Sequence, residues 1–237
     1  MVQAHYYSIL ERSRSSFRAL SEDEPRIQAF TAAHNDAEEL DQLKMLLSGR
    51  PEEEIFKLAL VEYQHALFSA AFGQYRQAHI SLRLFLELSL CCVQFSAHEI
   101  DARRWLKGEK DSNWSAIISN ETGVLSKSFV GVFFEPMKDS CGQYRAIAET
   151  LYRECSEYVH GNRQSYDGID AEISFAETVF DSWIDRAEAA RLVVKFAFLC
   201  RFLAYISADG KRAIEALALG NFGNLPAVQS IFEGAPE

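Results

Sequence analysis

The sequence has few residues that interrupt helices. Its 237 residues include only 12 glycines and five prolines, and no segment is biased enough in composition to predict disorder. It contains no internal repeat, no Gly-rich phosphate loop, no G-x-S-x-G elbow and no H-E-x-x-H pair. These absences argue against repeat folds, and they leave P-loop nucleotide hydrolases, serine hydrolases and zinc proteases without their motifs.

Cysteine is scarce, and its spacing predicts neither a metal site nor a disulfide framework. The five cysteines are Cys91, Cys92, Cys141, Cys155 and Cys200. Their number is odd, no two form a C-x-x-C pair, and no Cys/His cluster has zinc spacing. We therefore expect buried, reduced thiols in a reducing compartment, and we expect no bound metal and no cofactor.

Positive charge is in short supply as well. The chain has 24 Lys and Arg against 34 Asp and Glu, for a net charge of −10. This balance argues against a broad surface for duplex DNA, although a small basic cleft on an acidic body remains compatible with it. The amino terminus lacks a basic region followed by an apolar run, and the longest apolar stretch, residues 192–206, contains Lys195 and Arg201. Because that stretch is also too short to cross a bilayer, we expect a soluble, cytoplasmic protein with no membrane partner.

Apolar residues spaced three and four apart dominate the chain, and this spacing is typical of amphipathic helices. We expect an all-α protein: a bundle of about four long helices with additional short helices, in a single domain over residues 1–237. Helices are predicted over residues 3–20, 25–47, 51–73, 74–98, 136–160, 181–207 and 209–219, with short helices and loops over 101–136. A polar loop is expected over 161–168. Residues 169–180 partly alternate, so they could form a short strand or irregular cover.

The helix predicted over residues 136–160 has two distinct faces. Its core-facing stripe consists of Met137, Cys141, Tyr144, Ala148, Leu151, Cys155 and Tyr158. Arg153 and His160 are separated by a rotation of about 700°, so they lie nearly in line two turns apart and roughly opposite that stripe. They therefore face away from the core of their own chain. The simplest interpretation is a basic helix end with Gly161 as its stop signal.

The helix predicted over residues 74–98 is apolar almost all round, so we expect it to be largely buried. Within it, a narrow polar stripe contains Arg76, Arg83, Glu87 and Gln94, and Arg83 and Glu87 form an i, i+4 pair. Buried charges are unfavourable unless they are paired or functional. Two interpretations stay open: an internal ion pair that fixes helix packing, or a polar seam that lines a site. His79 on this helix is expected to be an ordinary helix residue.

The Arg153-x6-His160 spacing resembles the Arg-x(4–6)-His motif of the HEPN superfamily, small all-helical domains found in many ribonuclease toxins and anti-phage systems. Arg83-x3-Glu87 with a downstream His160 also resembles the Arg-x3-Glu…His set of anticodon nucleases in the same superfamily. Gly161 after the histidine and the helical context fit this resemblance. One position departs from the pattern: a small polar residue, Asn, Asp or His often follows the arginine, whereas Glu154 follows it here.

The resemblance implies metal-independent RNA cleavage at a cleft shared by two protomers. His160 would transfer protons and Arg153 would stabilise the phosphate. The supporting or RNA-binding residues implied are Arg83, Glu87, Glu157 and Asn162. The implied partners are RNA, with tRNA as one candidate, a second copy of the chain, and a neutralising or regulatory protein. The implied setting is that of a toxin or an antiviral (abortive infection) defence effector.

The sequence is also compatible with two other functions. The chain could be a catalytically inactive HEPN-like module that binds RNA, a nucleotide or a protein. It could also be a helical interaction protein without any nucleic-acid role, in which residues 153 and 160 are simply solvated.

Overall fold

The computed structural model describes residues 1–163, 167–169 and 172–232, and throughout these residues the regular structure is helical, with no strand. The all-α bundle expected from the sequence is therefore confirmed. The α-helices are α1 (Val2–Glu22), α2 (Glu24–Gln42), α3 (Glu52–Ala71), α4 (Tyr75–Phe95), α5 (Glu99–Leu106), α6 (Trp114–Ile117), α7 (Lys127–Phe134), α8 (Cys141–His160), α9 (Glu177–Phe202), α10 (Ala208–Phe222) and α11 (Pro226–Phe232). Short 3-10 helices cover Leu43–Leu47 (η1), Glu135–Met137 (η2) and Leu203–Tyr205 (η4).

The helices begin and end where local chemistry favours it. Asp23 caps α2 by accepting a hydrogen bond from the backbone N–H of Arg26, with Pro25 in the first turn. Gly73 separates α3 from α4 in the left-handed region, at φ 74°. A Cβ atom at this position would lie 2.6 Å from the carbonyl oxygen of Ser174, so the sharp turn between the two central helices requires glycine.

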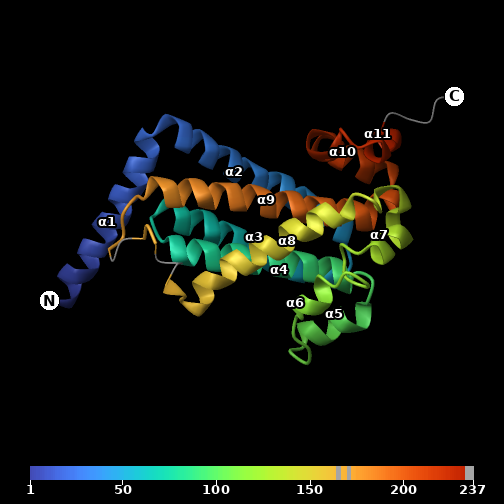
Figure 1. Cartoon of the computed structure of the whole chain (residues 1–237), viewed down its shortest axis with the longest axis horizontal. Coiled ribbons are helices and arrows are strands. Elements are labelled where there is room, and N and C mark those ends of the chain that lie inside the picture. Colours follow the sequence, from blue (N-terminus) through green and yellow to red (C-terminus); the bar gives the residue numbers. More distant parts are fainter. Residues whose placement is uncertain (164–166, 170–171, 233–237) are drawn as a thin grey trace.

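The long helices α3, α4, α8 and α9 form the centre of the bundle (Figure 1). α3 and α4 are consecutive and pack along their length, and α4 also packs on α8 and α9. α8 crosses α4 and α9, and α2 covers α9 from another side. Aromatic residues fill the interfaces: the ring centroids of Phe56 and Phe198 are 4.6 Å apart, and those of Tyr144 and Phe196 are 3.7 Å apart.

Two buried cations fasten α2 to α9. Arg191 and Lys195 of α9 are 5% and 2% exposed. The Nε atom of Arg191 lies 2.7 Å from a carboxylate oxygen of Asp36, and the Nζ atom of Lys195 lies 2.5 Å from one of Glu39. Because both charges are paired, they can be buried, and Lys195 is a core residue although the sequence suggested only an interruption of an apolar run.

α4 is long and apolar enough to cross a membrane by length and composition, but 67% of its most apolar 18-residue window is buried inside the bundle. This is the behaviour expected of the core helix of a soluble protein. All five cysteines are buried and free, as the sequence predicts.

The structure changes several predicted boundaries. The helix expected over 25–47 ends as an α-helix at Gln42 and continues as η1, and the one expected from residue 136 starts at Cys141 after η2. α9 begins at Glu177, before the expected residue 181, and α11 was missed. Residues 172–176 are neither helix nor strand. Residues 164–166 of the expected polar loop and 170–171 of the possible strand lie outside the described residues.

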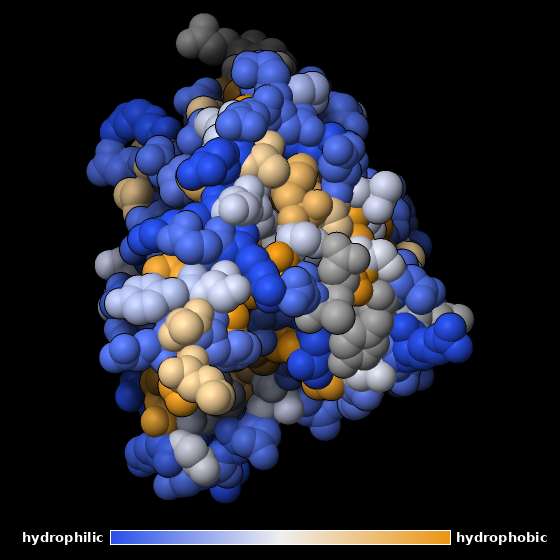
Figure 2. Space-filling model, turned by 90° about the vertical axis from the view of Figure 1, so that its left-hand side faces the viewer, coloured by the Kyte–Doolittle hydropathy of each residue, from blue (hydrophilic) through white to orange (hydrophobic). Residues whose placement is uncertain are grey.

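The surface at the end from which α1 projects mixes polar and apolar areas (Figure 2). α1 extends beyond the other helices there (Figure 1), and its Tyr6, Tyr7 and Leu10 are exposed. The expectation of one domain over residues 1–237 stays a prediction.

Candidate functional site on α8

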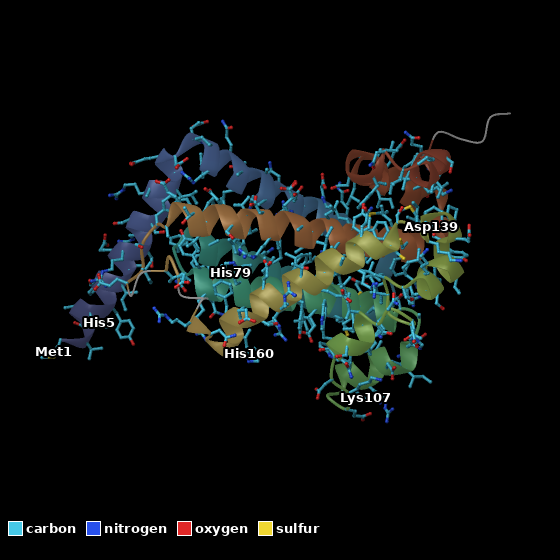
Figure 3. All side chains as sticks on the ribbon, viewed as in Figure 1. Met1, His5, His79, Lys107, Asp139 and His160 are labelled. Atoms are coloured by element: carbon cyan, nitrogen blue, oxygen red, sulfur yellow. The ribbon has the colours of Figure 1, made fainter. Side chains whose placement is uncertain are left out.

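α8 presents one face to the bundle and the opposite face to solvent. Cys141, Tyr144, Ala148, Leu151 and Cys155 are buried, in the stripe that the helical period predicts. Arg153 and His160 are both exposed on the outward side. Figure 3 shows His160 at the last turn of α8, at the edge of the molecule. The two residues therefore face away from the chain's own core.

Arg153 and His160 have no polar partner among the described residues. No hydrogen bond or ion pair joins the side chain of Arg153 or His160 to any residue in the described part of the chain. An unpaired guanidinium and an unpaired imidazole on one exposed face can both bind an outside ligand. Within the part of the chain that the structure describes, no hydrogen bond orients the imidazole ring.

The acidic residues near Arg153 on α8 pair with residues other than Arg153. Glu154 accepts a hydrogen bond from Arg186 of α9 at 2.8 Å, and Glu149 lies 3.7 Å from Arg145. Glu157 accepts a hydrogen bond from the side-chain amide of Asn162. The Glu154 carboxylate that departs from the HEPN pattern is thus neutralised by α9, which leaves the positive charge of Arg153 available to an anion.

The end of α8 is fixed by a left-handed cap. Gly161 has φ 68° and its N–H donates to the carbonyl of Glu157. The N–H of Asn162 donates to the same carbonyl at 3.3 Å. Glycine adopts this conformation without the steric penalty of a Cβ atom. Glu157 and Asn162, predicted as supporting residues, brace the turn that follows His160.

The Arg83–Glu87 pair lies between α4 and α8. Its closest N–O distance is 3.4 Å, and the two side chains are 21% and 12% exposed. The Nε atom of Arg83 donates to the Ser156 hydroxyl at 3.0 Å, another of its N–H groups donates to the Tyr152 hydroxyl, and Glu87 accepts from the Ser112 hydroxyl at 2.6 Å. The pair therefore connects two helices, as one of the two interpretations predicts.

The Arg83–Glu87 pair does not contact the exposed face of α8 that carries Arg153 and His160. Among the described residues, no hydrogen bond or ion pair joins Arg83 or Glu87 to Arg153 or His160. The structure relates them through α8 instead: Arg83 holds Tyr152, which precedes Arg153, and Ser156, one turn before His160.

Two residues of α4, Arg76 and His79, contact Tyr158 close to His160, and the sequence did not predict either of them as part of the site. The Nε atom of Arg76 donates to the carbonyl of Tyr158 at 3.0 Å. Its position seven residues before Arg83, on the same stripe of α4, is the signal that could have included it. The ring of His79 stacks on Tyr158 with centroids 3.9 Å apart, and no pattern in the sequence distinguished it from an ordinary helix residue.

His79 is a structural residue rather than an acid or base. Its ring is fully buried, and Nδ1 donates to the carbonyl of Tyr75 at 2.8 Å. Burial lowers its pKa to about 3, because the charged imidazolium would lose its hydration. It is therefore neutral in the folded protein at neutral pH.

No group of three or more His, Cys, Asp or Glu side chains in the described residues is placed to hold a metal ion. No family model, curated protein or solved structure matches the chain.

Proposed function

We propose that the protein is a HEPN-like, metal-independent endoribonuclease that acts as a homodimer, with Arg153 and His160 of both chains in one cleft. The observation that carries the proposal is the shared, outward position of these two side chains on α8, where neither has a polar partner among residues 1–163, 167–169 and 172–232. The paired state of Glu149, Glu154 and Glu157 supports it, because none of these carboxylates is committed to Arg153.

The chemistry requires a base, an acid and a group that stabilises negative charge. A neutral imidazole accepts the proton of a ribose 2′-hydroxyl, whose oxygen forms a bond to the adjacent phosphorus. The bond from phosphorus to the 5′ oxygen breaks, and that oxygen takes a proton from an imidazolium. Arg153 donates hydrogen bonds to the phosphate oxygens as charge builds up on them.

A second copy of the chain would supply what one copy lacks. A single His160 cannot be base and acid at the same moment, and it has no orienting partner within its own described chain. Two copies related by a twofold axis through this face would place two histidines and two arginines together. RNA, with tRNA as one candidate, would bind across that cleft, and its phosphates would pair with the two Arg153 guanidinium groups.

The test is RNA cleavage by the purified protein in EDTA, with His160→Ala and Arg153→Ala as variants. Each should lower the cleavage rate by at least about 100-fold, the scale of general acid–base and charge-stabilising groups. His65→Ala and Arg18→Ala are matched controls, because both residues are exposed on other helices. Cleavage that persists in both site variants would exclude the proposal.

The alternative is a catalytically inactive HEPN-like module that binds RNA, a nucleotide or a protein at the same face. The absence of an orienting partner for His160 in the described chain favours it. Expression in cells separates the two, since a nuclease toxin or defence effector should arrest growth and His160→Ala should restore it. Growth arrest by both proteins, or by neither, together with RNA binding, supports the inactive module.

A further inference from the structure

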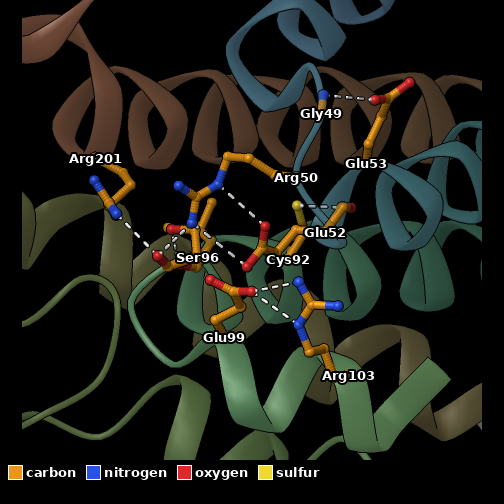
Figure 4. Close-up of polar contacts among 10 residues, drawn as sticks. Gly49, Arg50, Glu52, Glu53, Cys92, Ser96, Glu99, Arg103 and Arg201 are labelled. Atoms are coloured by element: carbon orange, nitrogen blue, oxygen red, sulfur yellow. Dashed lines mark hydrogen bonds and ion pairs between the residues drawn. The ribbon is translucent and has the colours of Figure 1, made fainter. Parts of the chain in front are cut away.

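Two arginines meet at one carbonyl group at the far end of the bundle from His160. Arg50, which follows η1, and Arg201, in the last turn of α9, donate to the carbonyl oxygen of Ser96 at 2.8 and 2.9 Å. Figure 4 shows the two guanidinium groups approaching Ser96 from different elements. Ser96 ends α4, so the negative end of that helix dipole helps to hold both cations there.

The cluster has more positive than negative charge. Glu52 is fully buried and lies 3.1 Å from Arg50. Arg201 forms no ion pair within the described residues, and its Nε atom is buried without a hydrogen-bond partner. Burial, and next the charge of Arg50, lowers the pKa of Arg201. Among the described residues, Glu52 is the one carboxylate paired with either guanidinium group, so the cluster keeps an excess of positive charge that an anion can neutralise.

The Arg201 side chain is held in place by aromatic rings. Its guanidinium carbon lies 4.0 Å from the ring centroid of Phe133 and 4.9 Å from that of Phe202. Such stacking fixes the planar group and leaves its edge free to donate hydrogen bonds. The arginine is therefore oriented before any ligand arrives, which reduces the entropy lost on binding.

A cavity of about 410 Å³ opens beside the two arginines. Its walls combine Arg50 and Arg201 with apolar and aromatic groups, among them Leu46, Phe202 and Tyr205. Tyr205 is 70% exposed. The first turn of α10, from Ser207, forms another wall, and the positive end of its dipole adds to the field. Asp209 also lines the cavity, and its carboxylate pairs with Arg212.

We propose that this cavity binds a small organic phosphate, with its phosphate on Arg50 and Arg201 and an apolar or aromatic body against Leu46, Phe202 and Tyr205. Guanidinium groups match phosphate oxygens through paired hydrogen bonds. A cavity of this volume accommodates a small ligand. A nucleoside monophosphate has both parts, a dianionic group and a flat ring. This site is separate from the α8 face and does not depend on the proposed nuclease activity.

Calorimetric titration of the purified full chain with AMP, and separately with adenosine, tests the proposal. AMP should bind, and adenosine, which lacks the phosphate, should bind at least about tenfold more weakly. Arg201→Met should weaken AMP binding at least about tenfold, the usual effect of losing hydrogen bonds to a charged group. Arg103→Met is the matched control, because Arg103 pairs with Glu99 on the neighbouring α5 and lies outside the cavity.

A second pair of variants guards against a failure of Arg201→Met to fold. Tyr205 is exposed, so Tyr205→Glu should fold normally and place a negative charge at the cavity wall. It should weaken AMP binding at least about tenfold by repulsion, compared with Tyr205→Gln. Three results would each overturn the site: no AMP binding by the wild-type protein, equal affinity for AMP and adenosine, or unchanged AMP affinity in both Arg201→Met and Tyr205→Glu. The two arginines would then serve only to cap α4.

Discussion

The guanidinium carbon of Arg83 on α4 lies 4.4 Å from the centroid of the Tyr152 ring on α8. Tyr152 also stacks on Trp114 of α6, with ring centroids 3.8 Å apart. A single tyrosine is thus enclosed between a cation and an indole, and it immediately precedes Arg153. Tyr152 therefore connects α4 and α6 to the residue that stands directly before Arg153 on α8.

Arg83→Met is expected to reduce stability and to slow RNA cleavage. The variant loses hydrogen bonds to Tyr152 and Ser156 and leaves Glu87 without its cation. The free energy of unfolding should fall by about 1–3 kcal/mol, as for other partly buried charged groups that lose a partner. Urea unfolding measures the first effect, and cleavage at a temperature where the variant stays folded measures the second. Full cleavage by the folded variant would show that Arg83 only packs the helices.

Mixing the wild-type chain with the His160→Ala chain should lower the activity of the wild-type chain. In a shared cleft, a mixed dimer contains one His160, whereas the proposed chemistry uses one imidazole as base and another as acid. When equal amounts are combined, about half of randomly assembled dimers are mixed. The measurement is the cleavage rate per wild-type chain after the two proteins are co-refolded, compared with the wild-type protein refolded alone, and an unchanged rate contradicts the shared cleft. The wild-type protein should also elute at twice the chain mass of 26.8 kDa. A monomer by light scattering contradicts this prediction.

Gly161→Ala should destabilise the end of α8. At φ 68° an alanine is strained by about 1 kcal/mol relative to glycine. Gly161→Asn should have a smaller effect, because asparagine adopts this conformation more readily. Thermal unfolding ranks the three proteins. Cleavage should follow the same order, since the cap fixes the turn on which His160 stands. Equal melting temperatures for alanine and glycine would show that the cap is not strained.

Stability should fall in mild acid because of His79. Its pKa is about 3 in the folded state against 6.5 ordinarily. Below pH 6.5 the unfolded chain therefore binds a proton that the folded chain refuses until about pH 3. The free energy of unfolding decreases by up to about 1.4 kcal/mol for each pH unit in this window, and above pH 6.5 the contribution is constant.

The variant His79→Phe keeps a ring to stack on Tyr158 and has no titrating group. Its urea unfolding at several pH values should show a flatter decrease between pH 6 and 4 than the wild-type protein. His65→Phe, at an exposed position on α3, serves as the control and should keep the wild-type slope. An unchanged slope in His79→Phe would assign the acid sensitivity to other groups.

The helical period predicted which α8 side chains face outward, but it did not predict which residues of other helices contact them. Spacing alone places Arg153 and His160 on one side, because a helix fixes the direction of every side chain once its core stripe is known. The partner of Glu154 could not be predicted in this way. Its pairing with Arg186 depends on how α8 and α9 cross, and that angle comes from side-chain packing over the whole interface.

Burial of charge was the hardest property to predict. Glu52 stands among three glutamates at the start of α3, where a favourable interaction with the helix dipole requires no burial. The structure buries it completely against Arg50. Arg50 and Arg201 are far apart in the sequence, and only the return of α9 to the end of α4 brings them to the same carbonyl.

The Glu154–Arg186 ion pair has a consequence for how related sequences should be compared. The Glu154 carboxylate directly follows Arg153, and it is tolerated in this protein because it forms an ion pair with Arg186 of α9. Positions 154 and 186 should therefore vary together. A relative that keeps Arg153 and His160 and Glu154 but has lost the positive charge at position 186 would look intact by its motif while carrying an unopposed negative charge beside its arginine.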